Sequence, residues 1–265
     1  ISGGWAAKEL TEKGLRVLVL ERGKDIRHGY DYVGEHASNW QLDYYGLPDR
    51  ELEQRDYEIQ HKSYAFSEAT RHFWNNDRLN PYERDKEKPF NWRRADVVGG
   101  RSLLWGRQVY RWSDQDFRAN QTDGFGVPWP VDYSDISKWY SHVESFIGVS
   151  GEAEGWPHLP DSEFLPPMDY YKIERTLKAR MREKIPDIPI TMGRVAILTV
   201  PYKGRQACHY CGPCHRGCSG GSYFSSQSST LPAARATGKL TLLSNQVVER
   251  LEHDELGQRI VAVNA

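Results

Sequence analysis

The sequence predicts an α/β fold, and three features of the chain lead to that prediction. Residues 4–14 read as a helix, and residues 15–20 follow it directly as an apolar strand. Residues 240–264 read as two or three further strands. Residues 25–92 mix charged and aromatic side chains with little hydrophobic period. A helix followed at once by an apolar strand is half of a βαβ unit, so we expect an α/β domain that carries an irregular insertion.

The composition bounds the class of protein. The 265 residues are 38% hydrophobic and 27% charged with a net charge of -1, which is typical of a globular chain of one large or two ordinary domains. No basic field exists for nucleic acid, so nucleic-acid binding is not expected. No run of about 18 apolar residues is present, so membrane attachment is expected only through a partner. The 9 Trp and 15 Tyr offer flat rings for stacking on planar ligands and sugar faces.

The remaining elements follow in order along the chain. A glycine-rich segment occupies residues 97–109, and a helix is expected over 134–146. Residues 151–170 are rich in proline and predict a loop. A second helix is expected over 172–184, with a strand over 190–200.

The start of the chain carries part of a dinucleotide-binding pattern. Gly3 stands before the first helix, where a glycine allows a phosphate group close to the helix N-terminus. Glu21 ends the first strand 18 residues later, where an acid accepts ribose hydroxyls, and Arg22 follows it. The chain begins inside this expected turn, so the first two glycines are expected just upstream. An ordinary helix and strand with Glu21 as a surface charge remains the alternative.

A second glycine segment brings in a family resemblance. The run Val98-Gly99-Gly100-Arg101-Ser102-Leu103-Leu104-Trp105-Gly106 is followed by Arg111 and by Asp116-Phe117. This pattern resembles the glucose-methanol-choline (GMC) oxidoreductases. The resemblance extends to residues 3–23 and to residues 231–248.

The resemblance implies a Rossmann-like FAD-binding domain of the GMC type with an irregular insertion and part of a substrate domain. It implies flavin contacts for nine positions: Gly3, Glu21, Arg22, Gly99, Gly100, Ser102, Trp105, Gly106 and Val248, the last through its backbone to adenine. Some relatives attach the flavin covalently through a His at the position of Leu104. A noncovalent flavin is therefore expected here.

Domain boundaries follow from the same resemblance. The FAD-binding domain is expected to be discontinuous, over 1–30, 93–125 and 205–265, and incomplete at both ends. Residues 31–92 are expected to form the insertion, and residues 126–204 part of the substrate or cap region. The family's catalytic His and its His or Asn partner are expected beyond residue 265, so the catalytic residues are unknown.

Four cysteines form the strongest single pattern of the sequence. Residues 208–218 contain all four, Cys208, Cys211, Cys214 and Cys218, spaced C-x2-C-x2-C-x3-C. Thiolates this close, with glycines between them, are suited to an iron-sulfur cluster, either [4Fe-4S] or [3Fe-4S]. Structural zinc usually draws its cysteines from two separated knuckles, and two disulfides would need awkward geometry. Both remain open as alternatives.

A flavin and a cluster together indicate a dehydrogenase that passes electrons singly to an acceptor. The resemblance implies oxidation of a sugar or glycoside hydroxyl, with C3-OH as the most specific case, and a cytochrome c type or quinone acceptor. It also implies a small chaperone-like subunit that carries the export signal, and hence a periplasmic location. The alternatives are a zinc-stabilised nucleotide-binding subunit and an NAD-dependent oxidoreductase.

Overall fold

The computed structural model describes residues 1–265, which separate into two compact units. Unit 1 comprises residues 1–105, 211–221 and 225–265, and unit 2 comprises residues 106–210 and 222–224. No helix of the chain has the length and apolar character needed to cross a bilayer.

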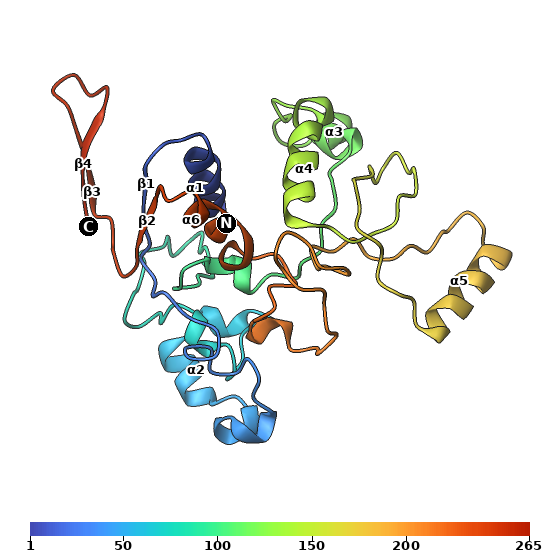
Figure 1. Ribbon diagram of the computed structural model, residues 1–265, viewed down its shortest axis with the longest axis horizontal. Coiled ribbons are helices and arrows are strands. Elements are labelled where there is room, and N and C mark those ends of the chain that lie inside the picture. The colour runs from blue at the N-terminus through green and yellow to red at the C-terminus, as the bar shows by residue number, and fades with distance from the viewer. The chain divides into compact units, whose positions relative to one another are not determined.

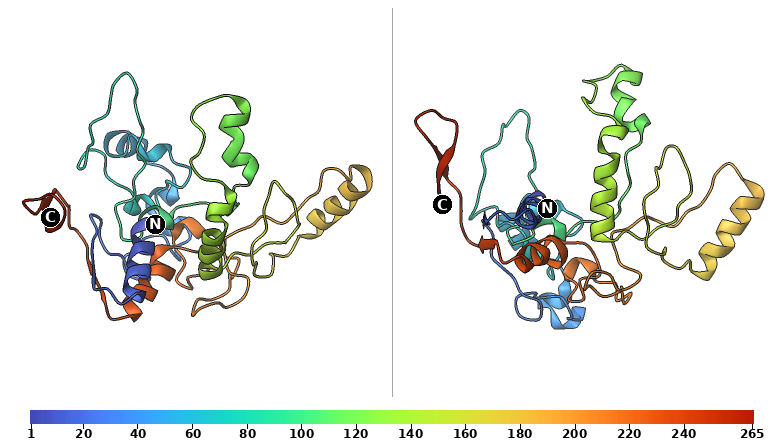
Figure 2. Two further views of the ribbon diagram at one scale, coloured as in Figure 1. Left: turned by 90° about the horizontal axis from the view of Figure 1, so that it is seen from above. Right: turned by 45° about the horizontal axis from the view of Figure 1, so that its top comes forward.

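In unit 1, a helix followed by a strand occurs twice, and the two strands pair with each other. Strand β1 (Val17–Leu20) pairs in parallel with β2 (Leu240–Leu243), with Val17 opposite Leu240. Helix α1 (Ser2–Glu12) precedes β1, and helix α6 (Leu231–Ala236) precedes β2. The two helices pack against each other beside the strands, as Figures 1 and 2 show. The helix expected over 4–14 and the strand expected over 15–20 are therefore confirmed. The helix lies two residues earlier, and the strand begins two residues later but ends at Leu20 as expected.

Strand β1 is less buried than its apolar sequence suggests. Leu18 is 56% exposed, and no residue of the strand is fully buried. The reason is that β1 has β2 as its one strand neighbour, while α1 and α6 pack beside the pair.

The C-terminal segment forms a separate hairpin. Strands β3 (Arg250–His253) and β4 (Ile260–Asn264) pair in antiparallel fashion. The amide of Gly257 donates to the carbonyl of Asp254 at 2.9 Å, which closes the turn. The strands and turn expected over 240–264 are confirmed.

The expected insertion is irregular, yet it supplies much of the core of unit 1. Its longest element is α2 (Arg50–Asp56), whose Asp49 cap accepts the Leu52 amide at 3.1 Å. A buried apolar cluster joins this stretch to the second glycine segment: Ile26, Tyr32, Ala65, Phe73, Trp74, Val97, Leu103 and Leu104. Residues 31–92 therefore share unit 1 with parts of the expected FAD-binding segments, namely residues 1–30, 93–105, 211–221 and 225–265, whereas residues 106–125, 205–210 and 222–224 fall in unit 2. The functional separation of the insertion stays a prediction.

Unit 2 contains three helices: α3 (Asp114–Asp123), α4 (Tyr133–Ile147) and α5 (Lys172–Lys184). The predicted helices over 134–146 and 172–184 are confirmed. The predicted strand over 190–200 is wrong, because this segment pairs only through single bridges, such as Val195 with Ser150 and Ile197 with Tyr223. Apolar, β-branched residues favour extended backbone there, but no neighbouring segment runs beside it long enough to form a ladder.

Candidate functional site

The carboxyl ends of β1 and β2 form the first part of the candidate site. Glu21 follows β1, and its carboxylate accepts the Gly23 amide at 2.8 Å. The backbone carbonyl of Glu21 accepts the amide of Gln246, which follows β2, at 2.9 Å. In open parallel sheets, ligands bind outside the carboxyl ends of the strands. The structure therefore places Glu21 at the edge where a nucleotide binds in this class of fold.

Gly23 connects this edge to the second glycine segment. A Cβ at Gly23 would meet the backbone of Asp96 and Val97 at 2.2 Å, so only glycine allows this approach. The next residue, Lys24, forms a parallel bridge with Val97, and its backbone carbonyl accepts the Val98 amide at 2.9 Å. The segment 96–98 thus lies directly beside the exit of β1.

The Gly99-Gly100 turn follows at once. Gly99 has φ +92° and Gly100 has φ +54°, conformations that favour glycine. The hydroxyl of fully buried Ser102 donates to the Gly99 carbonyl at 2.6 Å and accepts the Ser226 amide at 3.0 Å. Ser102 therefore fixes the turn against the π-helix Ser226–Thr230. Such single-turn π-helices are frequent at functional sites.

The start of α1 packs on the same π-helix. A Cβ at Gly4 would lie 2.7 Å from the Thr230 hydroxyl and 2.9 Å from the Ser226 hydroxyl. A Cβ at Gly3 would meet nothing within 4 Å. Gly4 thus allows the close approach of the helix, whereas the space beside Gly3 is open.

A basic cavity of about 280 Å³ opens beside Glu21. Its walls carry four arginines, Arg22, Arg93, Arg94 and Arg101, but only two carboxylates, Glu21 and Asp96. Arg22 lies 3.7 Å from Asp96, so one of the cations is paired.

Two of the other arginines lie over aromatic rings, Arg94 over Tyr82 and Trp92 and Arg101 over Trp74. Burial, together with the charge of Arg22, lowers the pKa of Arg94. Burial also lowers the pKa of Arg101, to which the charge of Arg93 contributes. The Nε atoms of Arg94 and Arg101 are buried without a hydrogen-bond partner. A concave site with excess positive charge is suited to an anionic group.

The cysteine segment crosses from one unit to the other. Cys208 belongs to unit 2, whereas Cys211, Cys214 and Cys218 belong to unit 1. None of the four cysteines forms a disulfide, and Cys211 is exposed. In unit 1, Arg216 donates to the Ala37 carbonyl at 2.7 Å and to the Asn39 side chain at 2.6 Å.

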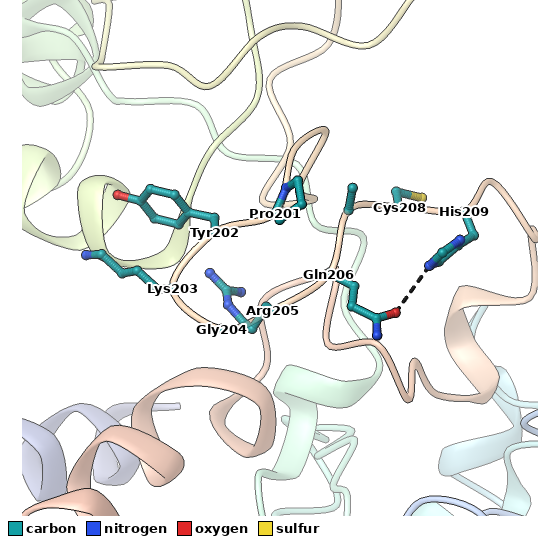
Figure 3. Close-up of a pocket in the computed structure, with 9 residues that line it drawn as sticks. Pro201, Tyr202, Lys203, Gly204, Arg205, Gln206, Cys208 and His209 are labelled. Carbon is teal, nitrogen blue, oxygen red and sulfur yellow. Dashed lines mark hydrogen bonds between the residues drawn. The ribbon is translucent and has the colours of Figure 1, made fainter.

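Cys208 lies at one end of an open pocket of about 720 Å³ formed by residues 201–209. Figure 3 shows Tyr202 and Lys203 at the opposite end of this pocket, and the hydrogen bond between Gln206 and His209. The Cys208 amide donates to the Leu198 carbonyl at 2.8 Å, and its sulfur accepts the Tyr210 amide at 3.4 Å. Two backbone contacts therefore hold Cys208 in place.

A sequence profile of the GMC oxidoreductases matches residues 11–265. The chain belongs to the GMC oxidoreductase family. It is also 25% identical over 269 residues to the large subunit of fructose dehydrogenase from Gluconobacter japonicus, an alignment that covers all of this chain and 46% of that relative. The chain thus spans about half the length of the curated relative it matches.

Members of the GMC family bind FAD in a Rossmann-like domain, so the α/β fold expected from the sequence holds at that level. The residues at the carboxyl edge of β1 fit such a dinucleotide. Glu21 offers a carboxylate for ribose hydroxyls, and the adjoining cavity offers the half-buried guanidinium groups of Arg94 and Arg101 for charged oxygens.

The other expected flavin positions of this GMC chain are distributed as follows. Trp105 is half-buried and ends the first segment of unit 1, and Gly106 is exposed at the start of unit 2. Val248 is 44% exposed after β2. Leu104 is fully buried in the core of unit 1, so this position serves packing.

The cysteines fit a cluster by chemistry but not by closed geometry. Four reduced thiols are the ligand type that iron-sulfur clusters use. However, no three Cys, His, Asp or Glu side chains of the chain converge into a group that could hold a metal ion. The chain supplies the ligands without a preassembled cage, and metal binding commonly completes such a site.

Sequence reasoning missed the arginine cavity and the π-helix. Arg93 and Arg94 lie in a stretch with no periodic pattern, so only the fold brings them to Glu21. The Ser-rich run Ser225-Ser226-Gln227-Ser228-Ser229-Thr230 was a usable signal, because so many small hydroxyl residues in sequence favour close packing and local hydrogen bonds.

Proposed function

We propose that this chain is the FAD-binding part of a dehydrogenase that oxidises a hydroxyl of a sugar or glycoside, with the C3 hydroxyl as the specific case. Electrons would leave through an iron-sulfur cluster held by the cysteine segment, to a cytochrome c type or quinone acceptor. When bound, a flavin supplies a two-electron hydride acceptor and a cluster supplies one-electron transfer. The observation that carries the proposal is the presence in one GMC chain of the Glu21 edge and four reduced, closely spaced thiols.

The residues of unit 1 have distinct roles in this proposal. Glu21 would accept hydrogen bonds from the ribose hydroxyls of FAD. The open face of Gly3 and the Gly99-Gly100 turn would let backbone amides approach the pyrophosphate. Arg94 and Arg101 would supply positive charge to the same dinucleotide. Because Leu104 is core, the flavin would be held without a covalent bond.

The cysteine segment would supply the cluster ligands Cys208, Cys211, Cys214 and Cys218. Three thiolates suffice for [3Fe-4S] and four for [4Fe-4S], and the number used decides between them. The proton acceptor for the alcohol is proposed to lie in the part of the enzyme that follows residue 265.

The substrate class and partners are supported by the relative. That protein is named a fructose dehydrogenase and a large subunit, which supports a sugar substrate and an assembly with other subunits. We extend this to a small chaperone-like subunit that carries the export signal, and to a periplasmic location with membrane contact through a partner alone.

The experiment that tests this proposal measures cofactors and turnover on the complete enzyme. We expect flavin absorbance, iron and acid-labile sulfide in fixed ratio to protein, and sugar oxidation with a dye acceptor. Cys211→Ser should lose iron and the cluster's electron paramagnetic resonance signal while it keeps the flavin. His209→Gln, in the same segment, is the matched control and should keep both. Bound zinc without flavin, or strict dependence on NAD, would contradict the proposal.

A second set of variants tests the nucleotide edge. Arg94→Met or Glu21→Gln should weaken FAD binding to the apoprotein by about tenfold or more, since each removes a charge-assisted contact. Arg50→Met, an exposed position on α2, should bind FAD as the unaltered protein does. Equal FAD affinity in all three variants would remove the basic cavity from the flavin site.

A further inference from the structure

Unit 2 contains a pocket that none of the flavin or cysteine residues line. The pocket has a volume of about 580 Å³ and lies between the start of α3 and the loop of residues 155–160. Its walls include Asp114, Gln115, Tyr133, Trp156, Pro157 and His158. Aromatic, carboxylate and amide groups thus converge on one space.

Hydrogen bonds and an ion pair fix the loop of residues 155–160, which forms one wall of the pocket. The carboxylate of Asp161 accepts the amides of Glu154 at 3.1 Å and Gly155 at 2.7 Å. Arg194, which is 1% exposed, pairs with Asp161 at 2.5 Å and donates to the Pro160 carbonyl at 2.8 Å. The loop is therefore preorganised, which reduces the entropy lost when a ligand binds.

Two rings of this loop stack on each other beside the pocket. The rings of Trp156 and His158 are nearly parallel, with an angle of 7° between their planes and 5.8 Å between their centroids. Trp156 is half-buried and His158 is exposed. The Leu159 amide donates to the Trp156 carbonyl at 3.0 Å, which holds the turn between the two rings. A flat, partly accessible indole packs well against the C-H face of a ring-shaped ligand.

The opposite wall offers hydrogen-bond acceptors and donors. Ser113 and Asp116 cap α3 together, which leaves Asp114 and Gln115 of the first turn to face outward. Asp114 is exposed and accepts the Tyr133 amide at 3.3 Å, so most of its acceptor capacity remains available. No Lys or Arg lines the pocket, so it does not favour an anion.

We propose that this pocket binds a pyranose ring of a neutral saccharide. The C-H face of the sugar would lie on Trp156, and neighbouring hydroxyls would donate to Asp114 and bond to Gln115. A neutral polyol matches an apolar ring surface facing a carboxylate, whereas a phosphate or a carboxylic acid would be repelled by Asp114. The choice of a sugar rests on the proposed function, but the pocket requires neither flavin nor cluster.

Equilibrium binding to the complete, oxidised enzyme without electron acceptor tests this proposal. The probe is methyl β-D-glucopyranoside. Its binding is measured by calorimetry and by saturation-transfer NMR at millimolar concentrations, where weak sugar binding is measurable. Trp156→Ala should weaken binding by about tenfold, and Trp156→Phe should restore most of it because a ring remains. Asp114→Asn should also weaken binding.

Trp139→Ala is the matched control, because Trp139 is 58% exposed on α4 and does not line the pocket. Its affinity should equal that of the unaltered enzyme. Unchanged affinity for the probe in Trp156→Ala and Asp114→Asn, or no binding of the probe at all, would overturn the proposal that this pocket binds a sugar. Dye-linked sugar oxidation that persists in that case leaves the proposed dehydrogenase standing. If the protein binds the probe but contains no flavin and shows no turnover, the proposed dehydrogenase activity is overturned and the proposed sugar pocket stands.

Discussion

Gly217 lies directly against the ring of Tyr32, so that a Cβ on Gly217 would come 2.5 Å from Tyr32 Cδ1 and 3.0 Å from Glu35 Oε1. Tyr32 is 6% exposed and Glu35 is 5% exposed, so neither can move away easily. The hydroxyl of Tyr32 also donates to the side chain of Gln227, beside the Gly99 turn. The segment between Cys214 and Cys218 is therefore seated on the irregular insertion, which ties the thiols of unit 1 to the body of that unit.

Gly217→Ala should destabilise unit 1 through this contact. Gly217 has φ +120°, where any side chain adds strain, and the new methyl group also meets a buried ring. Strain and overpacking together should cost about 2–4 kcal/mol. Thermal unfolding measures the change. Gly212→Ala is the control, since Gly212 has φ +91° but open space around it, and it should lose only about 1 kcal/mol. Equal losses in the two variants would show that Tyr32 does not confine the segment.

Adjacent glycines of α1 should respond in opposite directions. Gly4→Ala places a methyl group against the Thr230 and Ser226 hydroxyls and should cost about 1–2 kcal/mol after the gain in helix propensity. Gly3→Ala meets no protein atom within 4 Å and should stabilise the apoprotein by up to about 1 kcal/mol. Chemical unfolding of the flavin-free protein gives both values. Destabilisation by Gly3→Ala would contradict the open surface at that glycine.

A buried ion pair holds α4 in unit 2. Arg111 donates from Nε to Glu144 Oε2 at 2.9 Å and from Nη1 to the Tyr133 hydroxyl at 3.0 Å. Both charged side chains are less than a tenth exposed. Arg111→Met should therefore cost about 3–5 kcal/mol, because it leaves a buried carboxylate without its partner.

The exposed pair Lys184 and Glu183 on α5 provides the comparison for Arg111. Its side chains are 74% and 67% exposed, so Glu183→Gln should change the free energy of unfolding by less than about 0.5 kcal/mol. Hydrogen exchange of the α4 amides resolves the loss locally. If the α4 amides are equally protected from exchange in both variants, the Arg111 pair does not hold the helix.

The sequence was informative wherever structure is local. The helices expected over 134–146 and 172–184 are α4 and α5, and such elements are stabilised locally. In α4, for example, the carboxylate of Asp132 accepts the amides of Ser134 and Asp135. The prediction failed over residues 190–200, because a strand needs a partner and the residues alone do not show whether one lies alongside.

The same limit applies to the site. Glu21 and the Gly99-Gly100 turn were predicted, since each is a short motif with its own backbone requirement. The approach of Gly23 to Asp96, and the arginines it brings to Glu21, depend on how distant segments fold together. No sequence pattern predicts that these distant segments come together.

His72 should make the stability of unit 1 dependent on pH. Burial, with the nearby charges of Lys24 and Arg71, lowers the pKa of His72 from 6.5 to about 4. Its Nε2 accepts the Val33 amide at 3.4 Å, and its Nδ1 is buried without a partner, so the folded state holds the ring neutral. Protonation in the unfolded chain begins near pH 6.5, whereas protonation in the folded chain begins only near pH 4. The stabilisation is therefore complete above pH 6.5 and declines as the pH falls towards 4.

The free energy of unfolding can fall by about 3 kcal/mol between pH 6.5 and pH 4, since one pKa unit corresponds to about 1.4 kcal/mol. Urea unfolding across this pH range measures the slope. His72→Gln should flatten the curve, because it removes the titrating ring, whereas the exposed His253→Gln should leave it unchanged. A slope that survives in His72→Gln would assign the pH dependence to other groups, for example to carboxylates that lose their ion pairs in acid, such as Asp56, whose pKa is lowered by hydrogen bonds from Arg55 and Arg78.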